Sequence, residues 1–88
     1  MSFPVYDGAS ITPALRGSLQ RRNSEYYVRI SVEPDAAGGF EKRQVEIVLA
    51  DPASGEVMLQ RKVQFDQILL LGTNLQITTQ QITARLIP

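Results

Sequence analysis

The sequence predicts a single all-β domain, built as a small sandwich or a partly open barrel of five to six mostly antiparallel strands. Two observations support this fold class. Several short segments alternate apolar and polar residues with a period of two, and turn-forming residues separate these segments. No long segment repeats its apolar residues at the helical period, and 88 residues are enough for one core.

The N-terminal segment differs from the rest, and we divide the chain into an N-terminal arm over 1–13 and a single β domain over 14–88. The arm holds Phe3, Val5 and Tyr6, but prolines and a glycine interrupt any long period. Two interpretations stay open. The segment is a frayed end or first edge strand over the core, or it is an arm that lies on a neighbouring subunit.

The next segment, RGSLQRRNSEYYVR, combines arginine with tyrosine. Such side chains on a sheet hold single-stranded nucleic acid in OB- or SH3-like modules, which makes Arg21, Arg22 and Tyr27 candidate residues. Strand alternation sends Tyr26 and Tyr27 to opposite faces and weakens this interpretation. The alternatives are a solvated loop with one exposed tyrosine, or contact of the two arginines with acidic residues of a protein partner.

A half-buried strand is expected in the segment SEYYVRISVEP, because alternate residues over 26–32 are apolar and share one face. Pro34 ends this strand, since proline cannot donate to a ladder. The glycine-containing segment 34–42 then predicts a mobile connection, whose far end Phe40 attaches to the core.

The clearest element is a hairpin over 45–65, VEIVLADPASGEVMLQRKVQF. Two alternating runs flank a turn in which Asp51 suits the first corner and Gly55 can adopt a positive φ. We expect Ala50 to lie opposite Glu56, because this register brings the apolar residues of both strands to one face.

The C-terminal third is less regular. The run ILLL at 68–71 predicts a short buried strand, although a short helix over 66–71 fits the same residues. The parity of the apolar residues then switches within 78–81, which a bulge or a corner would explain. A last strand over 75–87 is rich in Thr and Gln and has few charges, so it would form a poorly protected edge.

The composition removes most catalytic and metal-binding chemistry. The chain has no histidine and no cysteine, which excludes thiol nucleophiles, Ser-His dyads, disulfides and ordinary zinc sites. No glycine-rich phosphate loop is present. The acidic pairs Glu33 with Asp35 and Asp51 with Glu56 flank turns, but the oxygen-rich repeat of a calcium loop is missing. We therefore expect no enzymatic activity, no cofactor and no bound metal.

Charge and hydropathy limit the partners. Nine basic and nine acidic residues cancel, which argues against nucleic acid as a partner. A carbohydrate-binding sandwich is a weaker alternative, because the chain has no tryptophan. No apolar run exceeds four residues, far below the 20 or so of a membrane helix, and no signal peptide is visible. We expect a place in the cytoplasm or within an assembled particle.

These exclusions favour a structural or assembly subunit, which makes protein–protein contacts with its own copies or with other subunits of a complex, a virion among others. A domain of this size buries only about 60 per cent of its unfolded surface and would gain stability from a partner. Arg61 falls on the apolar face of the hairpin, where it must reach water at the sheet margin or pair across an interface. The candidate interface residues are Phe3, Val5, Tyr6, Arg21, Arg22, Tyr27, Arg61, Gln76, Thr78 and Gln80.

Overall fold

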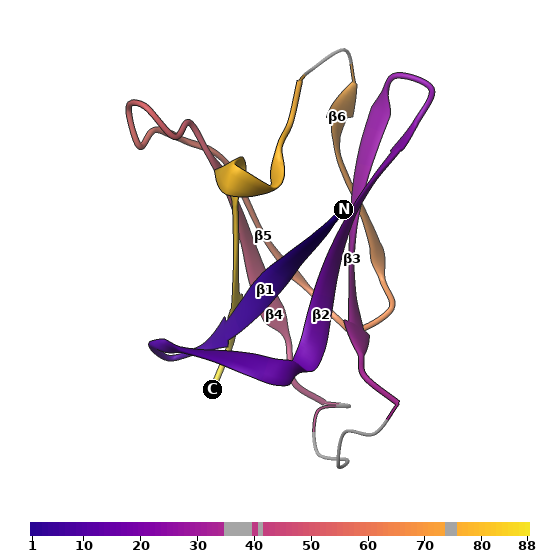
Figure 1. The fold of residues 1–88 in the computed structure, drawn as a ribbon, viewed down its shortest axis with the longest axis vertical. Helices are drawn as coiled ribbons and strands as arrows, with labels where there is room; N and C mark the ends of the chain where they lie inside the picture. Colours follow the sequence, from indigo (N-terminus) through magenta and orange to yellow (C-terminus); the bar gives the residue numbers. More distant parts are fainter. Residues whose placement is uncertain (35–39, 41, 74–75) are drawn as a thin grey trace.

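Seven strands form one continuous sheet in the computed structural model, which describes residues 1–34, 40, 42–73 and 76–88 (Figure 1). In chain order they are β1 (Ser2–Asp7), β2 (Ser10–Arg22), β3 (Glu25–Val32), β4 (Val45–Ala50), β5 (Val57–Val63), β6 (Ile68–Thr73) and β7 (Ile82–Leu86). Across the sheet the order is β5-β4-β7-β1-β2-β3-β6. The β1–β7 pair is parallel and the other five pairs are antiparallel.

The sheet curls into a nearly closed barrel whose two edge strands are β5 and β6 (Figure 1). Residues 64–67 join these two strands, which diverge from that short link. The link is held against β3, because the Asp66 N–H donates to the Ile30 carbonyl at 2.8 Å. No ladder joins β5 to β6 in the described residues, so the barrel stays open along this line. The all-β prediction is confirmed as a partly open barrel, with seven strands in place of five to six.

Two-residue turns join the first three strands. Gly8 and Asn23 begin these turns with φ of 63° and 57°, the left-handed region that glycine and asparagine adopt at least cost. Each turn therefore returns the chain directly alongside itself, and β1, β2 and β3 pair in succession. The β1–β2 register shifts between Pro4 and Tyr6, at an irregularity directly after a proline, which has no N–H to donate to the ladder.

Of the two interpretations of the N-terminal segment, the first strand over the core is nearer to the structure, although this strand is not at an edge. β1 lies between β7 and β2, and its Phe3 and Val5 are core residues. Gly17 is opposite Phe3 and leaves room for the aromatic ring, because a Cβ at this position would lie 2.1 Å from it. The inward alternation of β1 spans only Phe3 to Val5, which is too short for a periodicity argument to recognise.

The solvated loop considered for the arginine-containing segment is also wrong, because Arg21 and Arg22 of this segment lie on β2, the longest strand of the sheet. Leu15 and Leu19 point into the core, with Gly17 at the inward position between them. Glycine contributes no apolar side chain to the pattern, so the alternation was not visible in the sequence.

The strands predicted over 26–32 and 45–65 are confirmed, but the hairpin register is wrong. Ala50 lies opposite Val57, and the next pair is Leu49 with Leu59. The Ala50–Val57 pair is displaced by one position from the expected register, and the extra residue Met58 of a β-bulge increases the displacement of the further pairs to two. From Leu49 with Leu59 onward the faces were therefore predicted correctly even though the partners were not, whereas Val57 shares the outer face of Ala50.

The turn of this hairpin has the expected chemistry. Gly55 has a φ of 76°, and its N–H donates to the Asp51 carbonyl at 2.8 Å. The Asp51 carboxylate accepts the N–H groups of Ala53 and Ser54 at 2.8 and 3.2 Å. Asp51 thus acts as the turn-starting residue that the sequence predicts.

The C-terminal third keeps the predicted strand at 68–71 and excludes the competing helix over 66–71. The predicted corner is a single 3₁₀ turn, η1 (Thr79–Gln81), at which the Thr78 N–H donates to the Gln81 side chain at 2.8 Å. The last strand is shorter than the predicted 75–87 segment. It is not an edge, because β4 and β1 flank β7 on either side. The interpretation of this strand as a poorly protected edge is therefore wrong.

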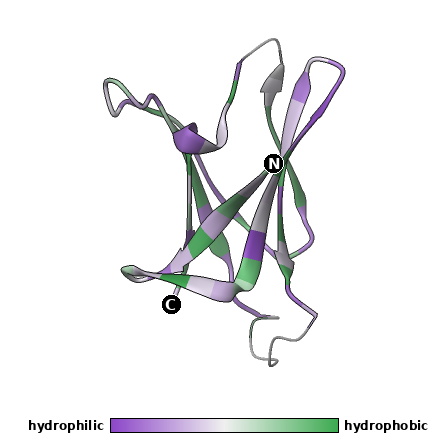
Figure 2. Ribbon diagram, in the orientation of Figure 1, coloured by the Kyte–Doolittle hydropathy of each residue, from purple (hydrophilic) through white to green (hydrophobic). Residues whose placement is uncertain are grey.

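One apolar core fills the barrel, and Figure 2 shows hydrophobic residues on strands all round it. Phe40 packs on this core and meets Phe65 edge to face, with ring centroids 6.1 Å apart, as expected for the end of the 34–42 connection. The rest of that connection, 35–39 and 41, lies outside the described residues. In the part of the chain that is described, no helix has the length and hydropathy of a membrane span. The core residues are Phe3, Val5, Leu15, Leu19, Tyr26, Val28, Ile30, Val45, Ile47, Leu49, Val63, Leu71, Ile77, Ile82, Ala84 and Leu86.

Candidate functional site

Strand β6, at one of the two edges of the sheet, exposes apolar side chains and free backbone groups. Its ladder bonds go to β3 alone within the described residues, so the backbone groups along its other side have no strand partner there. Ile68 and Leu70 face outward and are 63% and 47% exposed, whereas Leu71 faces the core. The strand ILLLGT carries no charge. Its burial was predicted incorrectly: both faces of the strand are apolar, but only one of them is covered.

The neighbouring strand extends this apolar area. Tyr27 of β3 lies opposite Leu70, and Arg29 lies opposite Ile68. Tyr27 is half-buried and faces outward with them. We call Tyr27, Ile68, Leu70 and the free backbone of β6 the β6 surface.

Tyr27 is the titratable member of the β6 surface. Desolvation raises the pKa of its phenol above the ordinary 10.0, and a hydrogen bond and the charge of Glu25 raise that pKa further. The positive charge of Arg22 acts in the opposite direction. The phenol is therefore neutral at physiological pH, which leaves the β6 surface without a charge of its own.

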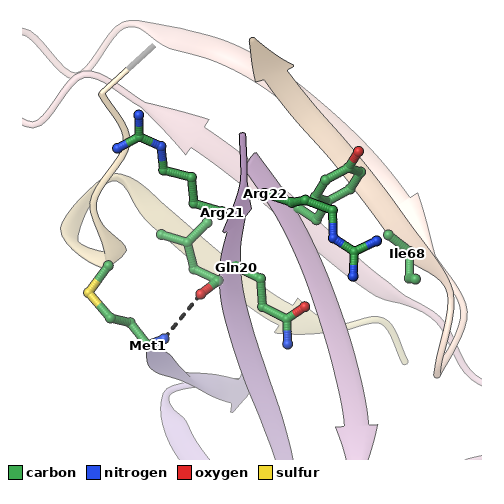
Figure 3. A pocket seen from close by; sticks show the side chains of 7 residues that line it. Met1, Gln20, Arg21, Arg22 and Ile68 are labelled. Atoms are coloured by element: carbon green, nitrogen blue, oxygen red, sulfur yellow. Dashed lines mark hydrogen bonds between the residues drawn. The ribbon is translucent and has the colours of Figure 1, made fainter. Parts of the chain in front are cut away.

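A hollow of about 650 Å³ adjoins the β6 surface at the β2–β3 end of the barrel (Figure 3). Figure 3 shows Met1 and Arg21 on one side of β2, and Gln20, Arg22 and Ile68 on the other. The two arginines therefore do not converge on one ligand. The lining residues are Met1, Leu19, Gln20, Arg21, Arg22, Tyr27 and Ile68.

Arg21 is engaged within the chain. Its guanidinium lies over the Tyr26 ring, 5.7 Å from the centroid, and its Nε donates to the Asn23 carbonyl at 3.0 Å. Tyr26 is a core residue, so this cation–π contact packs Arg21 against the ring of a core side chain. The structure gives Arg21 a packing role that the sequence did not indicate.

The second edge, β5, is different in charge. Val57 and Met58 are exposed there, but Arg61 and Lys62 follow on the same strand. Arg61 lies opposite Ile47, stays exposed at the margin of the sheet and donates to the Gln60 carbonyl at 2.8 Å. Charged side chains of this kind normally protect an edge strand from pairing.

The structure does not assemble the sequence-predicted residues into one site. Phe3 and Val5 lie inside the barrel, and Tyr6 is half-buried on β1. The β2–β3 hairpin carries Arg21, Arg22 and Tyr27, while Arg61 is on β5. The exposed residues at the η1 corner are Gln76, Thr78 and Gln80.

The acidic residues do not form a metal centre in the described residues, where no three His, Cys, Asp or Glu side chains gather. Glu33 lies 3.9 Å from Arg16 in an exposed ion pair, and Asp51 is bonded within its turn. Asp35, the expected neighbour of Glu33, lies outside the described residues.

Sequence reasoning missed Ile68 and Leu70 as site residues. The available signal was the uninterrupted run ILLL, which is apolar on both faces of a strand. Such a run indicates either a strand covered on both sides or an exposed apolar edge, and only the strand order distinguishes the two. Comparison of the chain with protein-family models, curated proteins and solved structures finds no match to any of them.

Proposed function

We propose that this protein is a non-enzymatic assembly subunit, which contacts another protein in a larger complex or particle through its β6 surface. One observation supports this proposal above the others: β6 is an uncharged edge strand with Ile68 and Leu70 exposed. A partner strand can add to such an edge. The main-chain hydrogen bonds then supply affinity and the alternate side chains supply specificity.

The physical argument rests on the rarity of unprotected edges. Natural edge strands usually carry lysine, proline or inward charges, because an apolar edge templates the pairing of another chain. Full burial of one large aliphatic side chain is worth about 1.5–3 kcal/mol, so covering Ile68 and Leu70 would contribute substantially to a contact. Tyr27 beside them adds an amphipathic ring of the type enriched at protein interfaces.

The direct test compares the two edges. Leu70→Lys places a charge on the β6 surface, and Met58→Lys places the same charge at an equally exposed apolar position on β5. Native mass spectrometry of the complex isolated from its source should show the partner lost from Leu70→Lys and retained with Met58→Lys. Thermal unfolding of the two variants serves as the control for folding. Equal retention of every partner by both variants would reject the β6 surface as the contact.

A second candidate function is binding of single-stranded nucleic acid in the manner of an OB- or SH3-like module. The observation in its favour is that Arg22, Gln20 and Tyr27 line the same hollow. Two features oppose it: a single outward ring makes a poor stacking platform, and Arg29 is already paired with Asp66 at 3.2 Å. We expect labelled oligo-dT and oligo-U to bind only weakly at physiological salt. A sub-micromolar Kd with a steep salt dependence would favour this function over assembly.

A further inference from the structure

We infer that the partner on the β6 surface is a second copy of this chain, paired antiparallel with β6 about a two-fold axis beside Leu69. This inference rests on the proposed function and names its partner. It follows from which residues of β6 can face one another when the strand meets its own copy.

The pleat restricts the possible registers. Directly opposite residues in an antiparallel pair point to the same face, so an outward residue must meet an outward residue of the second copy. Ile68 and Leu70 are the outward residues of the regular part of β6, which ends at a bulge before Gly72. A two-fold axis can pass beside Ile68, beside Leu69 or beside Leu70.

Only the axis beside Leu69 places both outward residues opposite apolar residues of the second copy. With the axis at Ile68, Leu70 would face Asp66 of the second copy, and with the axis at Leu70, Ile68 would face Gly72. With the axis at Leu69, Ile68 of each copy faces Leu70 of the other. This register therefore covers the two exposed apolar side chains of each chain with two others.

The charges around this register are compatible with self-pairing. β6 has no charged residue, so no like charges meet across the new ladder. Asp66 at the end of the strand is neutralised within its own chain by Arg29, with Nη2 and Oδ1 3.2 Å apart. A charged edge would need a partner of opposite sign, whereas an uncharged edge is complementary to itself.

The β3 strands flank the paired β6 strands on either side. Within each chain Tyr27 is opposite Leu70 and Arg29 is opposite Ile68. Ile68 and Leu70 from the two copies would thus form a four-residue strip with one Tyr27 and one Arg29 at either side. The hollow lined by Tyr27 and Ile68 borders the same strip.

The contact is small. One short strand pair and this strip fall below the 1,200 Å² or so of total buried surface typical of stable complexes. The dimer is accordingly weak and depends on protein concentration, with a Kd in the micromolar range or above.

Cysteine cross-linking tests the register, because the chain has no cysteine of its own. In the inferred dimer residue 69 lies opposite itself, at a Cα distance of about 4.5–5.5 Å. Leu69→Cys should therefore form a cross-linked dimer under mild oxidation or with a short bismaleimide. We expect at least tenfold more dimer than from Met58→Cys, the matched control at an exposed position on β5.

A second pair of variants tests the same register without changing Leu69, which is half-buried. Ile68→Cys and Leu70→Cys should cross-link more efficiently when mixed than when each is oxidised alone, since they face each other and not themselves. Leu70→Lys in the Leu69→Cys background should abolish the cross-link.

The outcomes separate this inference from the proposed function. Cross-linking no better than that of Met58→Cys, with a monomeric mass at millimolar concentration, overturns the self-pairing. If Leu70→Lys still loses a different protein from the native complex, the proposed function stands without it. If Leu70→Lys loses no protein from the native complex, both the self-pairing and the proposed function are rejected.

Discussion

The two edges of the sheet expose similar apolar side chains and differ in charge. On β5, Val57 and Met58 are 54% and 52% exposed, close to the values for the outward residues of β6. β5 continues with Arg61 and Lys62, whereas β6 has no charged residue. Both ladders contain one bulge, so irregular pairing does not distinguish the two edges.

This difference shows that apolar exposure alone does not identify a contact surface. Two adjacent cations require hydration and prevent a neighbouring strand from approaching β5 closely. The same exposed apolar area without cations leaves the β6 backbone free to pair. Charge on the edge is therefore the feature on which we base the proposed contact at β6, and the predictions below act on it in order of expected effect.

The largest effect is expected from breaking the sheet that holds both edges apart. Gly17→Val places a branched side chain where even a single Cβ would lie 2.1 Å from the Phe3 ring, so we expect a loss of about 2–3 kcal/mol in the free energy of unfolding. Urea unfolding followed by circular dichroism measures it. Ser18→Val, the next residue of β2 on the outer face, is the control and should change stability little. A stable Gly17→Val protein would show that the Phe3 ring does not occupy this space.

Removing the cations should make the two edges alike. We expect the double variant Arg61→Thr with Lys62→Thr to self-associate through β5, raising the light-scattering mass at equal concentration several-fold. The matched control is Arg16→Thr with Arg85→Thr, which removes the same charge from the internal strands β2 and β7. Equal association of both double variants would attribute the effect to net charge instead of to the edge.

The link between the edges should contribute little to stability. Asp66 has a φ of 62° and pairs with Arg29 at 3.2 Å, but both side chains are at least half exposed. Asp66→Asn removes the ion pair and keeps a residue that tolerates this φ, so we expect a loss of at most about 1 kcal/mol. Denaturant midpoints of the variant and of Arg29→Gln should agree. A much larger loss would mean that the link, and not the charge pattern, determines the position of β6.

The smallest effect concerns pH. The folded chain raises the pKa of Tyr27 above 10.0, which means that folding favours the neutral phenol. The resulting stability is fully present below about pH 10 and is lost as the pH rises through the higher folded pKa. Wild type should therefore lose stability relative to Tyr27→Phe only above pH 10, and ionised Tyr27 should also weaken association at β6. Parallel pH profiles for the two proteins up to pH 11 would contradict the assignment.

Local chemistry allowed part of this fold to be predicted. Asp51 and Gly55 determine a turn through their own hydrogen bonding and φ, so the β4–β5 hairpin was recognisable. The cross-strand pairs of this hairpin could not be predicted, because the bulge at Met58 does not interrupt the alternation of apolar and polar residues. β2 was missed because Gly17 occupies an inward position whose purpose becomes clear only beside Phe3.

The exposure of β6 could not be predicted for a different reason. It depends on the strand order, which the parallel pairing of Val5 with Ala84 helps to determine. That pairing brings the two ends of the chain into the middle of the sheet and leaves β5 and β6 at its edges. Contacts between residues so distant in sequence have no local signature, so the edges, and with them the candidate site, required the structure.

Hydrogen exchange of the backbone amides tests the central claim most directly, because it measures the pairing of the edges themselves. The protein should be compared at low and high concentration, with peptides covering β5 and β6 followed separately. The account predicts that protection rises with concentration in β6 and stays constant in β5. Protection that rises in β5, or in neither edge while the mass of the complex increases, would contradict the assignment of the contact to β6.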